Sequence, residues 1–87
     1  MRRRAEVEAM CRDLSRAANL ARERAATSEP EEAKYLLDCA RTWQHVSRHR
    51  SDDRGNCTGC RQTAAPCMEL NRQHGLAKRL VLAPAAV

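Results

Sequence analysis

The feature that most constrains the fold is the stretch Arg50–Pro66, which contains almost no large apolar side chain. It is rich in serine, aspartate, asparagine, glycine and arginine, so it cannot bury a core of its own. Such a segment is either disordered or ordered by something other than packing. Three cysteines, Cys57, Cys60 and Cys67, lie in it or directly after it. Metal binding would supply the missing order.

The rest of the chain offers few residues for a large core. The protein has 87 residues, 15 of its apolar residues are alanine, and it has one tryptophan and no phenylalanine. Chains this short often depend on a metal, disulfides or a partner for stability. We expect one small domain over residues 1–87, in which a metal cross-link or a second chain supplies what the core lacks.

Two segments show the apolar spacing of three and four that is typical of amphipathic helices. The first predicts a helix over residues 3–26, with a stripe formed by Val7, Met10, Leu14, Ala17, Ala18, Ala21 and Ala25. The second predicts a helix over residues 29–48, with a stripe formed by Ala33, Leu36, Leu37, Ala40, Trp43 and Val46. Helices joined by so few residues should fold back as an antiparallel hairpin.

The start of the second helix carries three signals. Ser28 and Glu31 have the spacing of a capping box, in which the hydroxyl and the carboxylate each bind a free backbone N–H. Pro30 falls in the first turn, where its missing N–H is tolerated. Glu29, Glu31 and Glu32 suit the positive end of the helix dipole.

A third, shorter helix is expected over residues 67–81, followed by a tail over 82–87. Its apolar residues are Met68, Leu70, Leu76, Leu80 and Val81. Gly75 lies inside this segment and could end a first helical part. The predicted fold class is therefore mainly α: a helical hairpin, a metal-binding loop over residues 49–67, and a short C-terminal helix.

The cysteine spacing favours a zinc knuckle. In Cys57-Thr-Gly-Cys60 a tight turn can bring two thiolates to one metal ion, and Gly59 tolerates the positive φ that such turns often need. Cys67 would open the last helix, close to free amides and the positive dipole end. Three thiolates leave tetrahedral Zn²⁺ one ligand short.

Four residues could be the fourth ligand: His49, His74, His45 and Cys39. Cys39 and His49 share a helical stripe but are ten residues apart, which is about 15 Å along the axis. Because ligand atoms of one zinc are only about 4 Å apart, these two cannot both bind it. We rank His49 first because it ends the helix, with seven residues between it and Cys57. His74 ranks second, and Cys39 is expected to fill the core.

The segment His49-x-x-Asp52-x-x-Gly55-x-Cys57-x-x-Cys60, followed by Pro66-Cys67, resembles a pattern of small actinobacterial proteins. The resemblance covers about 20 residues. It implies zinc held by one histidine and three cysteines, and it implies no defined activity. Asp52 then either bonds the ligating histidine or is a solvated loop residue.

A second resemblance is to the WhiB-like regulators, which hold an iron–sulfur cluster with a distant cysteine, a Cys-x-x-Cys pair and one further cysteine. Cys39, Cys57, Cys60 and Cys67 could imitate that set. The chain departs from the family because its last gap has six residues instead of five, and because the Gly-[Val/Ile]-Trp-Gly-Gly turn is absent. Both departures favour zinc over a cluster.

The start of the chain, Met1-Arg-Arg-Arg, does not resemble a signal peptide, and the apolar tail is too short to span a membrane. We therefore expect a cytoplasmic protein, in which clustered cysteines indicate metal rather than disulfides. The net charge of +5 allows an acidic partner, but 14 of the 16 basic residues are arginine, as codon bias in a GC-rich genome would produce.

The function expected from the sequence is a structural zinc module and not an enzyme, because a fourth ligand is available and no Glu adjoins the cysteines as a general base. A protein partner or a homodimer is the first expectation, with no small-molecule substrate. The alternative is nucleic-acid binding, since Arg48, Arg50, Arg54 and Arg61 surround the loop and could contact phosphates. No aromatic residue in the loop could stack on bases, which favours the protein partner.

Overall fold

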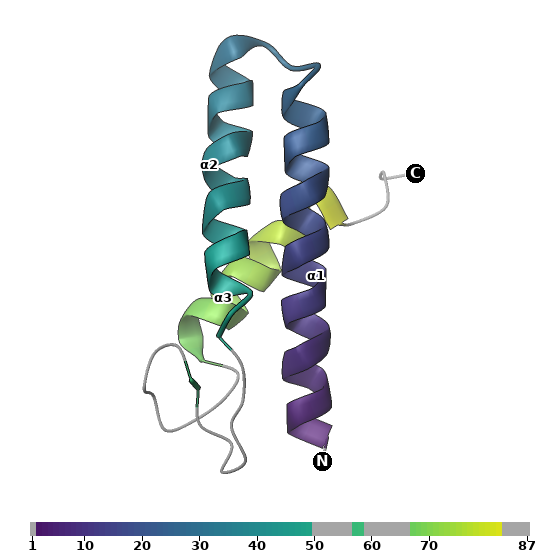
Figure 1. Cartoon of the computed structure of the whole chain (residues 1–87), viewed down its shortest axis with the longest axis vertical. Coiled ribbons are helices and arrows are strands. Elements are labelled where there is room, and N and C mark those ends of the chain that lie inside the picture. The colour runs from purple at the N-terminus through teal and green to yellow at the C-terminus, as the bar shows by residue number, and fades with distance from the viewer. Residues whose placement is uncertain (1, 50–56, 59–66, 83–87) are drawn as a thin grey trace.

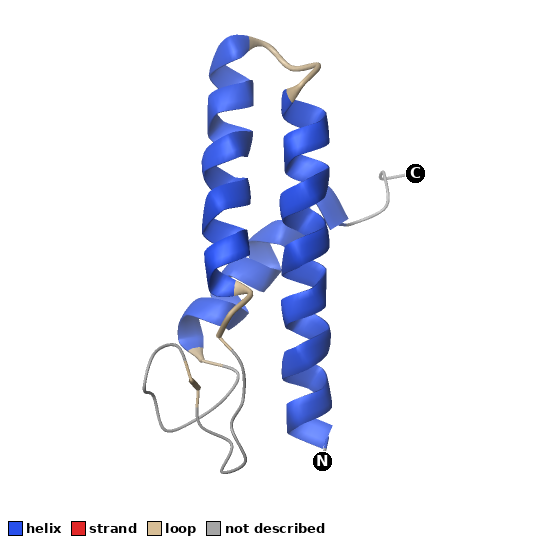
Figure 2. Ribbon diagram, in the orientation of Figure 1, coloured by secondary structure: helices blue, strands red, loops and turns tan. Residues whose placement is uncertain are grey.

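The computed structural model describes residues 2–49, 57–58 and 67–82. These residues form three α-helices, α1 (Arg2–Ala25), α2 (Pro30–Val46) and α3 (Met68–Ala77), and a π-helical turn, η1 (Lys78–Leu82). The part of the ribbon that the structure describes is almost entirely helical (Figure 2), so the mainly α fold class is confirmed. None of the described helices has the length and apolar character needed to cross a membrane.

Helices α1 and α2 lie side by side and antiparallel, joined by a short connection over residues 26–29 (Figure 1). The predicted stripe of α1 is buried apart from Met10, which is partly buried against the core. In α2 the buried residues are Leu36, Cys39, Ala40, Trp43 and Val46. The expectation that Leu37 belongs to the stripe is wrong, because its side chain is 46% exposed. One residue turns an α-helix by about 100°, and this carries Leu37 away from the face of Leu36.

The beginning of α2 differs from the predicted capping box. Glu29 is the N-cap residue and makes no side-chain capping bond. The hydroxyl of Ser28 instead donates to the carbonyl of Arg24, at 2.7 Å, and so stabilises the end of α1. Serine hydroxyls readily take such local backbone partners. Pro30 does occupy the first turn, as predicted.

Helix α3 and η1 cross one side of the hairpin obliquely, running from the end of α2 toward the middle of α1 (Figure 1). A buried set that includes Leu70 and Ala77 joins α3 to the common core. The indole N–H of Trp43 on α2 donates to the side-chain oxygen of Gln73 on α3, at 3.1 Å. Trp43 is fully buried, so this bond gives its only polar atom a partner.

Two further polar contacts hold this element against α1. His74 Nε2 lies 2.9 Å from Asp13 Oδ2, and Arg24 donates from Nη1 to the carbonyl of Leu80 at 2.7 Å. Backbone carbonyls at a helix end have no intrahelical partner, so the arginine supplies one. The C-terminal element is thus held along its length by apolar and polar contacts.

The ends of the helices refine the predicted boundaries. Helix α2 stops at Val46 instead of residue 48, because Ser47 is the C-cap and the chain then turns. The suggestion that Gly75 ends a first helical part is wrong, since α3 continues through it to Ala77 and then into η1. Leu82 belongs to η1 and not to the tail. The remainder of the predicted tail, residues 83–87, lies outside the described residues.

Candidate metal centre

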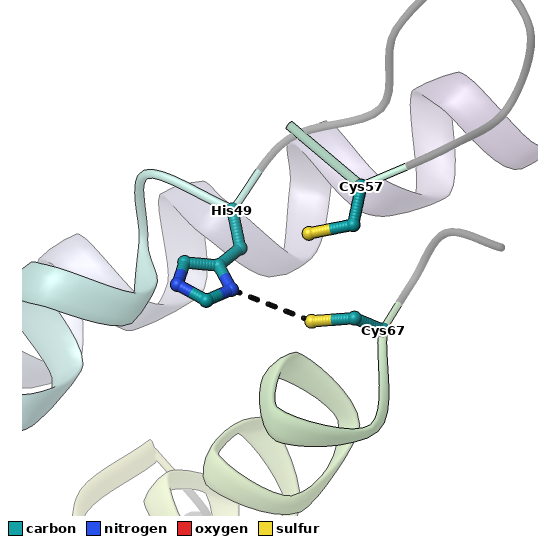
Figure 3. Close-up of side chains that lie close together, drawn as sticks. All are labelled: His49, Cys57 and Cys67. Carbon is teal, nitrogen blue, oxygen red and sulfur yellow. Dashed lines mark hydrogen bonds between the residues drawn. The ribbon is translucent and has the colours of Figure 1, made fainter. Parts of the chain in front are cut away.

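Three side chains from separate parts of the chain converge at one end of the hairpin. His49, Cys57 and Cys67 each offer one ligand atom, and these atoms all lie within 4.8 Å of one another. Figure 3 shows the three side chains pointing toward one another, with the imidazole of His49 facing the sulfur of Cys67. Cys57 and Cys67 are 3% and 1% exposed, and His49 is partly buried. The cluster is therefore largely shielded from water.

The tight turn that ends α2 places His49. The N–H of Ser47 donates to the carbonyl of Trp43 at 2.9 Å, and its hydroxyl donates to the carbonyl of Gln44 at 2.6 Å. The N–H of His49 then bonds the carbonyl of Val46 at 2.9 Å. These bonds satisfy carbonyls that the helix end would leave unpaired. They also fix the backbone from which the imidazole projects.

The first turn of α3 places Cys67. Cys67 is the N-cap residue, with extended φ and ψ of −74° and 167°, and its sulfur accepts a hydrogen bond from the backbone N–H of Leu70 at 3.4 Å. The thiolate is the form of cysteine that binds a metal. The sulfur of Cys67 thus lies at the N-terminal end of α3, beside a backbone N–H of the first turn. The expectation that Cys67 opens the last helix is confirmed.

The separation of His49 and Cys67 is close to that of two ligands of one zinc ion. Zinc binds nitrogen at about 2.0–2.1 Å and sulfur at about 2.3 Å, so a tetrahedral site puts nitrogen and sulfur about 3.6 Å apart and two sulfurs about 3.8 Å apart. His49 Nδ1 and Cys67 Sγ are 3.4 Å apart. A small adjustment would bring the ligand atoms of His49, Cys57 and Cys67 to one ion. One nitrogen and two sulfurs are donors that suit zinc and other thiophilic metals.

Other predicted residues of the site lie outside the described residues. These are Cys60, the second cysteine of the predicted knuckle, together with Gly59 and Asp52. Of this segment the structure describes Cys57 and Thr58, and it places Cys57 beside His49 near the end of α2.

The structure separates the alternative ligands from the cluster. His74 faces Asp13 on α1 instead. The ring of His45 is exposed and lies 6.0 Å from that of His49, in an edge-on arrangement. Of the histidines that the sequence left open, the structure thus brings only His49 to the described cysteines.

Cys39 is buried in the middle of α2, as a core-filling thiol would be. It is outside the described cluster. Its hydrogen bond with Tyr35, together with the repulsion between the ionised forms of the two groups, raises the pKa of Tyr35 above the ordinary 10.0. Cys39 therefore has a local partner one turn away on its own helix.

Sequence reasoning missed the contribution of α1 to this region. Cys11 is fully buried, and its sulfur donates to the backbone carbonyl of His49 at 3.5 Å. The available signal was the spacing of Cys11 from Val7 and Leu14, four residues after one and three before the other, which places all three on the apolar face of α1. That spacing indicates burial, but it does not show which residue of another helix the thiol would meet.

The fold and the cluster together define a helical hairpin with a third helix packed across it and a group of side chains that could hold a metal ion. Comparison of this chain with family models, with curated proteins and with solved structures found no match. The function therefore has to be argued from the site itself.

Proposed function

We propose that the protein binds one structural zinc ion through His49, Cys57, Cys60 and Cys67. The observation that supports this most strongly is the convergence of three buried or partly buried donor atoms within 4.8 Å, from the end of α2, from the segment at Cys57 and from the start of α3. Cys60 completes the set by its Cys-x-x-Cys spacing from Cys57, which is typical of zinc knuckles.

Zinc in this position would fasten the N-terminal end of α3 to the C-terminal end of α2. The segment between them, residues 50–66, has almost no large apolar residue to hold it in place. Metal binding energy can supply folding energy in small domains with a thin core. The ion would thus act on the architecture of the protein, and four protein ligands would leave no open position for a substrate or a water.

A role without catalysis is part of the proposal. In the part of the chain that the structure describes, the cluster contains no carboxylate that could act as a general base beside the metal. Catalytic zinc sites need an open coordination position and usually such a base. We infer that the module presents a surface to a protein partner or to a second copy of itself, and that the metal maintains the shape of that surface.

Metal analysis tests the zinc proposal directly. Protein purified without added metal should contain one zinc per chain and be colourless, and cobalt substitution should give the intense visible absorption of a tetrahedral thiolate site. Replacing His49 with alanine, or Cys57, Cys60 or Cys67 with serine, should each lower the metal affinity strongly. Cys39→Ser is the matched control and should bind zinc normally.

Two outcomes would contradict the zinc proposal. A brown protein that contains iron and loses its colour in the Cys39 variant would indicate the cluster of a WhiB-like regulator. A protein whose zinc affinity depends on His74 and not on His49 would indicate that His74 is the fourth ligand.

Zinc chelation should also reduce the helix content seen by circular dichroism, because α3 would lose its attachment to the end of α2.

The choice of partner needs separate measurements. Light scattering at several concentrations tests for a homodimer. Binding to DNA of mixed sequence, measured over a range of salt concentrations, tests the nucleic-acid alternative, because phosphate contacts make affinity fall steeply with salt. We expect no binding at physiological ionic strength, and strong salt-dependent binding would favour the alternative.

A further inference from the structure

The thiol of Cys11, on α1, contacts the backbone of His49, one of the proposed metal ligands. The residue is fully buried and belongs to the same core cluster as Cys57 and Cys67. Its sulfur lies 3.5 Å from the carbonyl oxygen of His49, across a sequence separation of 38 residues. This contact joins α1 to the candidate metal centre.

The contact gives the thiol of Cys11 a defined role. A carbonyl oxygen only accepts hydrogen bonds, so in this contact the Cys11 thiol is the donor. A metal ligand is a thiolate, with no proton to donate. In addition, Cys11 lies outside the described cluster of ligand atoms. These observations point to a supporting role and not to a fifth ligand.

The backbone of His49 is held from two sides. Its N–H donates to the carbonyl of Val46 at 2.9 Å, and this bond is part of the turn that ends α2. Its carbonyl accepts from Cys11 at 3.5 Å. Because the imidazole projects from this backbone, fixing both polar groups limits the directions in which Nδ1 can point. A ligand atom that already faces the ion loses less conformational freedom when the metal binds.

We propose that Cys11 is a positioning residue of the metal centre, whose thiol holds the His49 backbone so that the imidazole faces Cys67. This inference rests on the proposed zinc site. It adds that α1 takes part in metal binding through one hydrogen bond, so that the site ties α1 to the end of α2 and to the start of α3.

Two substitutions separate hydrogen bonding from packing. Cys11→Val removes the donor but fills the same region of the core with an apolar side chain of similar size. Cys11→Ser keeps a donor and places a polar hydroxyl in the core, where it packs less well. Valine should therefore give the more stable metal-free protein, while serine should give the higher zinc affinity. If Cys11 contributed only packing, the valine variant would have both the higher metal-free stability and the higher zinc affinity.

Zinc affinity is measured by competition with a chromophoric chelator, and metal-free stability by urea unfolding followed by circular dichroism. The S–H group is a weak donor, so its loss should make Cys11→Val bind zinc about fivefold more weakly than the wild type. Cys11→Ser should remain within about twofold of the wild type. Cys39→Val, a substitution of the other buried helical cysteine away from the cluster, should leave zinc affinity unchanged. Cobalt spectra of Cys11→Val should show a distorted site.

The results can fail in distinguishable ways. A wild-type protein that binds no zinc would overturn both the proposed function and this inference. Normal zinc affinity in Cys11→Val, or equal weakening by valine and serine, would overturn the positioning role and leave the zinc site intact. If Cys11→Val does not fold, Cys11→Ala removes the donor without adding volume. Its zinc affinity is then compared with that of Cys11→Ser, and normal affinity in Cys11→Ala, or equal weakening in both variants, would overturn the positioning role.

Discussion

Replacing Gly75 with alanine should stabilise the protein, although glycine at this position suggests a break in the helix. Gly75 lies inside α3, which runs on to Ala77, and a Cβ atom added there would meet nothing within 4 Å. Alanine in a helix interior is favoured over glycine by about 0.5–1 kcal/mol, because glycine loses more backbone freedom on folding. For a domain of this size, that gain corresponds to a rise in Tm of about 2–8 °C.

Urea unfolding followed by circular dichroism, with zinc at a fixed excess, measures this effect. The comparison variant is Gly75→Pro, which removes a helical N–H and introduces a clash with the preceding turn. It should lower the free energy of unfolding by about 3 kcal/mol if α3 remains docked. The two substitutions at one position should therefore have opposite signs.

A neutral or destabilising Gly75→Ala would refute the reasoning, since it would mean that residue 75 is not in the interior of a continuous helix. A harmless Gly75→Pro would lead to the same conclusion. Either result would restore the sequence-based alternative in which Gly75 ends a first helical segment.

Three further predictions test the packing of the helices. Leu70→Ala should lower the free energy of unfolding by about 2–5 kcal/mol in urea titrations, because Leu70 is fully buried, and a loss below about 1 kcal/mol would contradict that burial. His74→Ala should cost about 1 kcal/mol in the same assay, because the contact with Asp13 is lost, and no loss would show that the contact is absent in solution. Cys39→Ala should lower the pKa of Tyr35 toward 10.0 in ultraviolet titrations, since the bond that favours the neutral phenol is removed, and an unchanged pKa would exclude that bond.

The helical hairpin could be predicted from the sequence because its signals are periodic and local. The spacing of Val7, Leu14 and Ala21 in α1, and of Leu36 and Trp43 in α2, fixes which faces are buried. The helix ends were predicted less accurately, because capping residues can form several competing local hydrogen bonds. Ser28 shows this, since its hydroxyl had a carbonyl of the preceding helix within reach as well as the amides of the next.

The convergence of His49, Cys57 and Cys67 could be predicted from the sequence, but the surroundings of this cluster could not. The cysteine spacing and the place of His49 at the end of the second helix indicated that the three side chains meet. The contact of Cys11 with His49 and that of His74 with Asp13 join residues 38 and 61 positions apart. Such contacts depend on how α3 crosses the hairpin, and no periodicity within one helix specifies that crossing.

The oblique position of α3 has a consequence for the order of folding. Its contacts close long stretches of chain, because Asp13 and His74 are 61 positions apart in the sequence and Arg24 and Leu80 are 56 positions apart. The hairpin needs only a short turn, and local contacts form faster than distant ones. Zinc held by residues 49 and 67 would shorten the chain that α3 must close before it reaches α1. Stopped-flow refolding, followed by the fluorescence of the single tryptophan, should therefore accelerate with zinc. A rate independent of zinc would mean that the ion enters only after α3 has docked.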